Sequence, residues 1–181
     1  MILDLPFKRR TAWSCGGPIL MILLVAAGCK QKPEASATEP PTLASALSLG
    51  DPASSPQLLK GFYGVEQGAW RWTAQQFSVA LRPPAGSAQS GATLTFNFTV
   101  PDSTIQNLKT VTLSAAAGGT ALAPETYSRP GVYAYQRDIA ANLLAGDRVQ
   151  IDFQLDKVNP PKPPDLRPLG VVAAKVGLEL K

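Results

Sequence analysis

The chain contains no histidine and only two cysteines among its 181 residues. Histidine is the usual general base that activates serine and cysteine nucleophiles, and imidazole is a common ligand of zinc. The sequence also lacks a phosphate-binding P-loop, a dinucleotide-binding glycine pattern and a calcium-binding loop. These absences exclude most catalytic functions, so we expect a protein that is not an enzyme and that binds no metal or cofactor.

Pairs of carboxylates are the remaining route to catalysis. Asp152 and Asp156 lie on one face of an expected strand, where four residues separate their Cα atoms by about 13 Å. That spacing exceeds the separation of roughly 5 to 9.5 Å between the two carboxyl groups of glycosidases. Pairs across strands, such as Asp138 with Asp147, stay open, although turn residues and helix caps are the commoner role of such side chains.

The chain also lacks an apolar run long enough to span a membrane. Residues 18–28 ("PILMILLVAAG") would form a helix of about 16 Å, against a hydrocarbon core of about 30 Å. Lys8, Arg9 and Arg10 precede this run, a pattern typical of a secretory signal peptide. We therefore expect residues 1–28 to direct export and then to be removed.

The end of this run, "LVAAGC", resembles the signal of bacterial lipoproteins. The resemblance implies that Cys29 receives acyl chains such as palmitate and becomes the mature N-terminus, so that the membrane is one partner. It also implies a location in the bacterial cell envelope, at the periplasmic face of the outer membrane if the host is Gram-negative, because Lys30 rather than aspartate follows Cys29. The alternative is that Cys29 is an ordinary small residue at the end of the apolar run.

Basic residues are too few and too scattered to suggest a nucleic-acid partner. The net charge of +4 falls to +2 once Lys8, Arg9, Arg10 and Asp4 leave with the signal. No cluster of lysine and arginine remains that would neutralise several phosphates together.

Residues 29–57 are rich in proline, serine and alanine, and from residue 30 onward they include no aromatic residue. Such a segment buries too little apolar area to offset the entropy lost on ordering. We predict a disordered tether that begins at the lipidated cysteine.

Residues 58–181 contain a period of two in their apolar residues, which indicates half-buried strands. In residues 93–100 and 148–156, apolar side chains alternate strictly with polar ones. Further strands are expected at residues 76–81, 108–115, 131–138 and 170–180, and in the last of these Val172, Ala174, Val176, Leu178 and Leu180 would share one face. Turn residues separate the strands at residues 82–91, 100–107, 116–120 and 159–165, and only residues 140–144 suggest a single helical turn. The pattern predicts an all-β fold, one antiparallel β-sandwich of the jelly-roll or immunoglobulin-like kind with about seven to nine strands.

Trp70 and Trp72 flank Arg71 in the stretch "GFYGVEQGAWRW". In a strand the two indoles project to one face and Arg71 to the other. They are either core residues or part of an exposed aromatic platform, and the sequence leaves both open.

The segment "GFYGVE...WRW" and the closing "PDLRPLGVVAAKVGLEL" resemble the small β-sandwich modules that accompany bacterial glycosyltransferases and other polysaccharide enzymes. The matching positions are Glu66, Arg71, Trp72, Asp165 and Arg167. The resemblance implies a glycan ligand, for which the candidate contacts are Tyr63, Glu66, Trp70, Arg71, Trp72, Asp165 and Arg167. In a structural alternative, Glu66 or Asp165 forms an ion pair with Arg71 or Arg167 and so pins the two ends of the domain together.

Two functions are therefore expected. The first is a non-catalytic, membrane-anchored lipoprotein that binds glycan through its β-sandwich. The second is an envelope scaffold lipoprotein that binds another protein.

Overall fold

A computed structural model describes residues 42–181, which form nine β-strands, two short α-helices and two 3-10 helices. The strands are β1 (Ala46–Ser48), β2 (Leu58–Glu66), β3 (Trp70–Leu81), β4 (Ala92–Val100), β5 (Val111–Ala117), β6 (Thr120–Tyr127), β7 (Gly131–Ile139), β8 (Val149–Leu155) and β9 (Val172–Leu180). The helices are η1 (Pro52–Gln57), α1 (Ser87–Ser90), α2 (Asp102–Leu108) and η2 (Ala141–Leu143).

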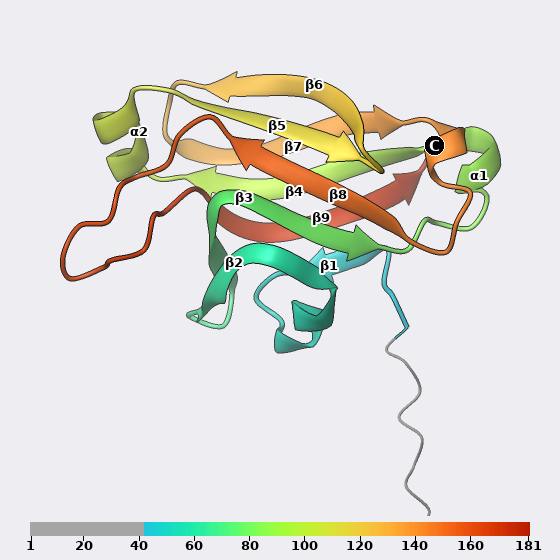
Figure 1. The fold of residues 1–181 in the computed structure, drawn as a ribbon, viewed down its shortest axis with the longest axis horizontal. Helices are drawn as coiled ribbons and strands as arrows, with labels where there is room; N and C mark the ends of the chain where they lie inside the picture. The colour runs from blue at the N-terminus through green and yellow to red at the C-terminus, as the bar shows by residue number, and fades with distance from the viewer. Residues whose placement is uncertain (1–41) are drawn as a thin grey trace, which may run out of the picture. The chain divides into compact units, whose positions relative to one another are not determined.

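The strands pair in the order β6-β5-β8-β3-β9-β4-β7, with β1 added to β9 and β2 added to β3. Strand β3 connects the two layers, because Arg71 and Trp72 pair with β9 whereas the segment from Gln76 to Leu81 pairs with β8. The result is two facing layers (Figure 1), and every named strand pair is antiparallel. The predicted all-β antiparallel sandwich is confirmed.

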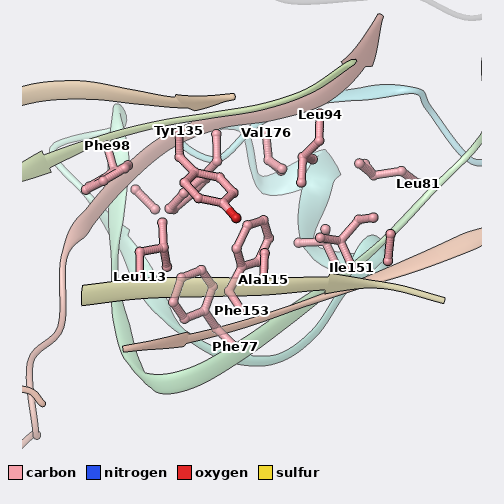
Figure 2. Packing of buried hydrophobic residues seen from close by; sticks show 14 of the residues in the cluster. Phe77, Leu81, Leu94, Phe98, Leu113, Ala115, Tyr135, Ile151, Phe153 and Val176 are labelled. Atoms are coloured by element: carbon pink, nitrogen blue, oxygen red, sulfur yellow. The ribbon is translucent and has the colours of Figure 1, made fainter. Parts of the chain in front are cut away.

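The core lies between the layers and follows the predicted alternation in the two clearest strands. All four inward residues of β8 are buried, as are those of β4. Figure 2 shows Phe77 of β3 against Phe153 of β8, two rings that stack with their centroids 5.0 Å apart. Burial of these aromatic and aliphatic side chains, at about 1.5 to 3 kcal/mol each, is the main stabilising contribution.

Side chains close the gap between the end strands β6 and β7. The hydroxyl of the buried Tyr135 donates to the carbonyl oxygen of Ala123 at 2.7 Å, and Nε of Arg137 donates to the same oxygen at 2.7 Å. Arg137 also forms an ion pair with Glu125 at 3.0 Å. The seam makes the sandwich a nearly closed sheet with little free strand edge at this side.

The expected alternation of β9 is wrong. The register against β4 shifts between Asn97 and Phe98, which pair with Lys175 and Ala173, so Ala174 forms a bulge. A bulge reverses which face the following residues occupy relative to those before it. The buried residues are therefore Ala173, Val176, Gly177 and Leu178, whereas Ala174 and Leu180 are exposed.

The ordered domain begins earlier than residue 58, so the tether prediction is wrong for the segment from residue 46 to residue 57. This segment forms β1 and η1, and the side chains of Leu47 and Leu49 are 4% and 0% exposed. Strand β1 pairs with β9. The proline-, serine- and alanine-rich composition predicted disorder, but the two leucines are buried in a core that the rest of the chain forms. The expected signal peptide, Cys29 and the start of the tether lie outside the described residues.

Two further details differ from expectation. The turn predicted at residues 100–107 is instead occupied mostly by α2, which starts after Pro101 and carries the acidic Asp102 in its first turn. Proline before a helix and a carboxylate in the first turn both favour helix initiation. Strand β6 was not predicted, although the turn expected at residues 116–120 is present, and Gly118 and Gly119 there have positive φ angles of 53° and 84°. Within residues 42–181, no helix is long and apolar enough to span a membrane.

Candidate functional site

Trp70 and Trp72 lie at the start of β3 and are both half-buried, while the intervening Arg71 and the following Thr73 are buried. The two indoles thus share the outer face, as the alternation predicts. Their ring centroids are 6.1 Å apart and their planes meet at 85°. They are therefore neither core residues nor a flat platform, because perpendicular rings cannot stack on one plane together.

Arg71 points the other way and is only 8% exposed. Its guanidinium donates from Nε to the carbonyl oxygen of Leu49 at 2.8 Å, from Nη1 to that of Tyr63 at 3.0 Å, and from Nη2 to the hydroxyl of Ser55 at 2.9 Å. These bonds join the segment before β2 to β2 and β3. Such a buried cation with all its groups engaged has a structural role, so the geometry separates Arg71 from the other candidate ligand contacts.

Arg167 connects the two ends of the domain. It lies in the loop between β8 and β9, residues 156–171, where its guanidinium binds Asp165 at 2.7 Å and Glu66 at 2.9 Å. Glu66 is the last residue of β2. The ion pair that the structural alternative predicted is therefore present, and Arg167 rather than Arg71 forms it.

Tyr63 supports the same arrangement from β2. Its hydroxyl donates to the carbonyl oxygen of Pro168 at 2.9 Å, and the guanidinium carbon of Arg167 lies 5.0 Å from the centroid of its ring. This distance is within the range of a cation–π contact. Tyr63 thus fixes both the arginine and the backbone of the loop.

Asp165 and Arg167 keep their charges around neutral pH. Hydrogen bonds from the side chain of Arg167, followed by one from its backbone N–H, lower the pKa of Asp165 to about 2. The hydrogen bonds that the guanidinium of Arg167 donates to Asp165 and Glu66 raise the pKa of this guanidinium. Asp165 is therefore ionised under ordinary conditions and has no proton to donate as a general acid.

An open groove of about 520 Å³ lies where α2 approaches the β8–β9 loop. Apolar and polar side chains both line it: Trp72, Leu108, Pro160 and Leu169 together with Ser103, Asn107, Asn159, Lys162, Asp165 and Arg167. We call this site the Trp72 groove. Its volume falls within the range of small-molecule sites.

A chain of amides holds the two walls of the Trp72 groove together. Nδ2 of Asn107 in α2 donates to Oδ1 of Asn159 at 3.0 Å, and Nδ2 of Asn159 donates to the hydroxyl of Thr104 at 2.8 Å. Asn159 also pairs through its backbone with Leu169 on the other side of the loop. Sequence reasoning missed both asparagines, since they are 52 positions apart and α2 was expected to be a turn.

Three of the predicted contacts, Trp72, Asp165 and Arg167, line the groove directly. Glu66 and Tyr63 do not line it but contact Arg167, and Trp70 forms a T-shaped pair with Trp72. The two short motifs at the ends of the domain thus meet in space. Among the residues that the structure describes, no group of three or more histidine, cysteine, aspartate or glutamate side chains is placed to hold a metal ion.

A second, smaller depression of about 330 Å³ lies over β3, β5 and β8. Five polar side chains, those of Lys60, Gln76, Ser114, Asp152 and Gln154, line it together with three alanines and Phe153. Its one aromatic lining residue, Phe153, belongs to the core and is 2% exposed. We call this site the sheet depression; it offers no aromatic face to a ligand.

No protein-family model matches the chain, and no curated protein matches it in sequence. Among solved structures, a carbohydrate-binding module that recognises mannan is similar over 77% of this chain and 97% of its own, with 13% identity and a TM-score of 0.47. A carbohydrate-binding domain of a multidomain xylanase from the hindgut metagenome of Trinervitermes trinervoides is similar over 57% and 68%, with 11% identity and a TM-score of 0.33. The cycloalternan-forming enzyme from Listeria monocytogenes is similar over 68% of this chain but 11% of its own, with 10% identity and a TM-score of 0.38. These likenesses are distant and concern only the β-sandwich architecture.

Proposed function

We propose that this domain binds a glycan in the Trp72 groove and does not transform it. One observation carries the proposal. The half-buried indole of Trp72 and hydrogen-bonding side chains from α2 and the β8–β9 loop line the same groove, which has a volume of about 520 Å³. An indole provides a broad apolar surface for the C–H face of a pyranose ring, while amides and hydroxyls match its hydroxyl groups.

The walls of the groove are held in place before any ligand arrives. Arg167 clamps the β8–β9 loop to Glu66, and Nζ of Lys157 in the same loop donates to the carbonyl oxygen of Leu108 in α2 at 3.0 Å. Ordered walls reduce the entropy lost on binding. A rigid groove of this kind favours one ligand shape, whereas a groove that changes its shape on binding would accept many.

The perpendicular indoles limit the kind of glycan surface that fits. With 85° between their planes, only one of Trp70 and Trp72 can stack on a given sugar ring. The domain is therefore suited to a single glycan chain in the groove and not to the flat surface of a crystalline polysaccharide.

The proposal of a non-catalytic role rests on the state of the carboxylates. Asp165 lies in the groove but is ionised and bound to Arg167, and Glu66 is bound to the same guanidinium. Asp165 is therefore not available as the protonated acid that glycosidases need.

Affinity electrophoresis of the purified chain in gels that contain soluble polysaccharides tests the proposal. We expect at least one polysaccharide to retard the wild type. Trp72→Ala should abolish this retardation, because the substitution removes the indole that stacks on the sugar. Trp70→Ala is the matched control, since Trp70 does not line the groove, and it should keep most of the retardation. Equal loss in both variants with unchanged folding, or no retardation by any polysaccharide, would contradict the proposal.

We further propose that Cys29 carries a lipid that anchors the domain in a bacterial envelope. Support comes from the sequence alone, from the short apolar run and the "LVAAGC" that ends it. Mass spectrometry of the protein extracted from membranes should find an acylated N-terminal Cys29, and a Cys29→Ser variant should lose this mass and remain unprocessed. A bare thiol in the membrane-extracted protein would refute the anchor.

A second candidate function, the binding of another envelope protein, is favoured by one observation. The side chain of Val132 is 82% exposed, and it stands in register, through Thr99, with Val172 and Trp72. Partners across strands point to one face, so this row forms a small apolar strip on the outer surface. A photoreactive residue at position 132 that cross-links one defined envelope protein, with no glycan bound, would make this the better account.

A further inference from the structure

We propose that the glycan recognised by the Trp72 groove carries carboxylate groups, as uronates do, and that Lys162 with Nη1 of Arg167 recognises one of them. This inference rests on the proposed function and names the class of its ligand. It follows from which hydrogen-bonding groups of the groove are already used within the protein and which remain free.

The acceptors contributed by carboxylates are largely used. Oδ1 of Asp165 accepts from the backbone N–H of Arg167 at 2.9 Å and from its Nε at 3.0 Å, and Oδ2 accepts from Nη2 at 2.7 Å. Nη2 also donates to Oε1 of Glu66 at 2.9 Å. A ligand hydroxyl therefore finds little free carboxylate at this side of the groove.

The amides are also engaged with each other. Asn159 uses its Oδ1 to accept from Asn107 and its Nδ2 to donate to Thr104, so neither side-chain atom is fully free for a ligand. With respect to the described part of the chain, the side-chain oxygen and one N–H of Asn107 and the hydroxyl of Ser103 are without a hydrogen-bond partner. These groups suit the neutral hydroxyls of any sugar and do not distinguish one class of glycan from another.

Two positively charged donor groups, in contrast, remain free. Within residues 42–181, the ammonium of Lys162 forms no hydrogen bond or ion pair, and Nη1 of Arg167 forms no hydrogen bond. The backbone of Lys162 is nevertheless fixed, because its N–H donates to the carbonyl oxygen of Asp165 at 2.9 Å and the two residues form a bridge across the loop. An ammonium on a fixed backbone and a guanidinium N–H in one groove can form charge-assisted hydrogen bonds to a carboxylate, which are about twice as strong as neutral ones.

The summed charge of the cluster decides whether a polyanion is attracted from a distance or only through local contacts. Lys162 and Arg167 offset Asp165 and Glu66, so the cluster has no net charge that would attract polyanions from a distance. Recognition should therefore depend on local contacts. Replacing Lys162 by an uncharged residue should lower glycan affinity much more than the same replacement of a lysine elsewhere. Lys175, exposed on the outer face of β9 and away from the groove, is a matched control.

The experiment measures binding of the purified chain to a set of paired polysaccharides. Each pair has one backbone in a charged and an uncharged form: polygalacturonate with its methyl ester, alginate with its methyl ester, and hyaluronate with its methyl ester. Neutral galactan, mannan and xylan are added, and dextran sulfate distinguishes carboxylate from sulfate. We expect at least one uronate to bind about tenfold more tightly than its ester, an advantage that Lys162→Gln removes, Lys162→Arg largely retains and Lys175→Gln leaves unchanged.

Several results would overturn the inference. Equal affinity for charged and esterified forms, or binding only to neutral polysaccharides, would refute the carboxylate while leaving the proposed function intact. Preference for dextran sulfate over every uronate would assign the site to sulfate instead. Equal weakening by Lys162→Gln and Lys175→Gln would mean nonspecific charge attraction. Absence of binding to every polysaccharide would overturn the proposed function together with this inference.

Discussion

Arg167 holds the β8–β9 loop through Asp165 and reaches Glu66 at the end of β2. Its side chain is 36% exposed, so we expect it to contribute little to global stability but much to the shape of the groove. Arg167→Ala should lower the melting temperature by no more than about 3 °C and still reduce glycan binding at least about tenfold.

The matched control for this prediction is Arg137→Ala. Arg137 forms a comparable ion pair with Glu125 at the β6–β7 seam, remote from the residues that line the Trp72 groove. Arg137→Ala should lower the melting temperature and leave glycan binding unchanged. If Arg167→Ala unfolds the domain outright, or leaves binding unchanged, the positioning role of Arg167 is wrong.

The carboxyl of Asp165 gives a pH prediction. Because Arg167 lowers its pKa in the folded protein to about 2, from 3.8, this group stabilises the fold fully above about pH 4. The contribution is lost as the pH falls from about 4 toward 2, where the folded protein also takes up the proton. Urea unfolding of the wild type and of Asp165→Asn should therefore differ at pH 6 and converge at pH 2. A difference that is constant across this range would contradict the assignment.

At the scale of the elements, β2 pairs irregularly with β3, because the register shifts between Lys60 and Phe62, and a glycine within this shift gives a test of the pairing. Gly61 has a φ of +74°, and a Cβ there would collide with the carbonyl oxygen of Gln76. Gly61→Ala should cost about 2 kcal/mol or more. Gly64, three positions along, has open space around it and should tolerate alanine with little change. Denaturant unfolding that finds the two substitutions equally harmless would show that β2 pairs differently.

The segment from β1 to η1 tests where the domain begins. Leu47 and Leu49 are buried, and Arg71 holds this segment through the carbonyl oxygen of Leu49. A chain that starts at residue 58 should therefore be less stable than one that starts at residue 42 by about 5 kcal/mol or more. Equal stability of the two chains would mean that the segment before residue 58 is a tether and not part of the folded domain.

The regular strands were predictable because their pattern is local. In β4 and β8 the alternation of apolar and polar residues alone identifies the buried face, and both strands are as expected. Strand β9 is different, since the bulge at Ala174 is set by its pairing with β4 and leaves no mark in its own composition. The burial of Leu47 likewise depends on β9, which lies more than a hundred residues away.

The site was predictable in the same partial way. Trp72, Asp165 and Arg167 were named from motifs at the two ends of the domain, and the fold brings them into one groove. Asn107 and Asn159 carry no signal of their own, because their meeting depends on how α2 packs against the β8–β9 loop. Arg71 was named as a candidate contact, but strand alternation alone already placed it on the face opposite the indoles.

At the scale of the whole domain, the chain enters far from the groove. The carbonyl oxygen of Ala44 accepts from the N–H of Arg82, at the end of β3 opposite to Trp72. Leu81 lies nine positions after Trp72 along β3, a span of up to about 30 Å. Figure 1 shows α2 and the β8–β9 loop at one end of the domain, with α1 and the C-terminus at the other.

This separation predicts that attachment through the N-terminus leaves the groove open. Protein biotinylated at its N-terminus and fixed on a sensor surface should bind glycan as tightly as it does in solution. Attachment through a cysteine introduced at Gln106, on α2 beside the groove, should block most binding. Equal binding in both orientations would place the ligand away from the groove.

The central claim is that the Trp72 groove is the glycan site, and an NMR titration with a bound oligosaccharide tests it most directly. The account predicts that the largest shifts occur at the indole N–H of Trp72 and the side-chain amides of Asn107 and Asn159, with small shifts at Gln76 and Gln154. Shifts concentrated at Gln76 and Gln154, in the sheet depression, would contradict it.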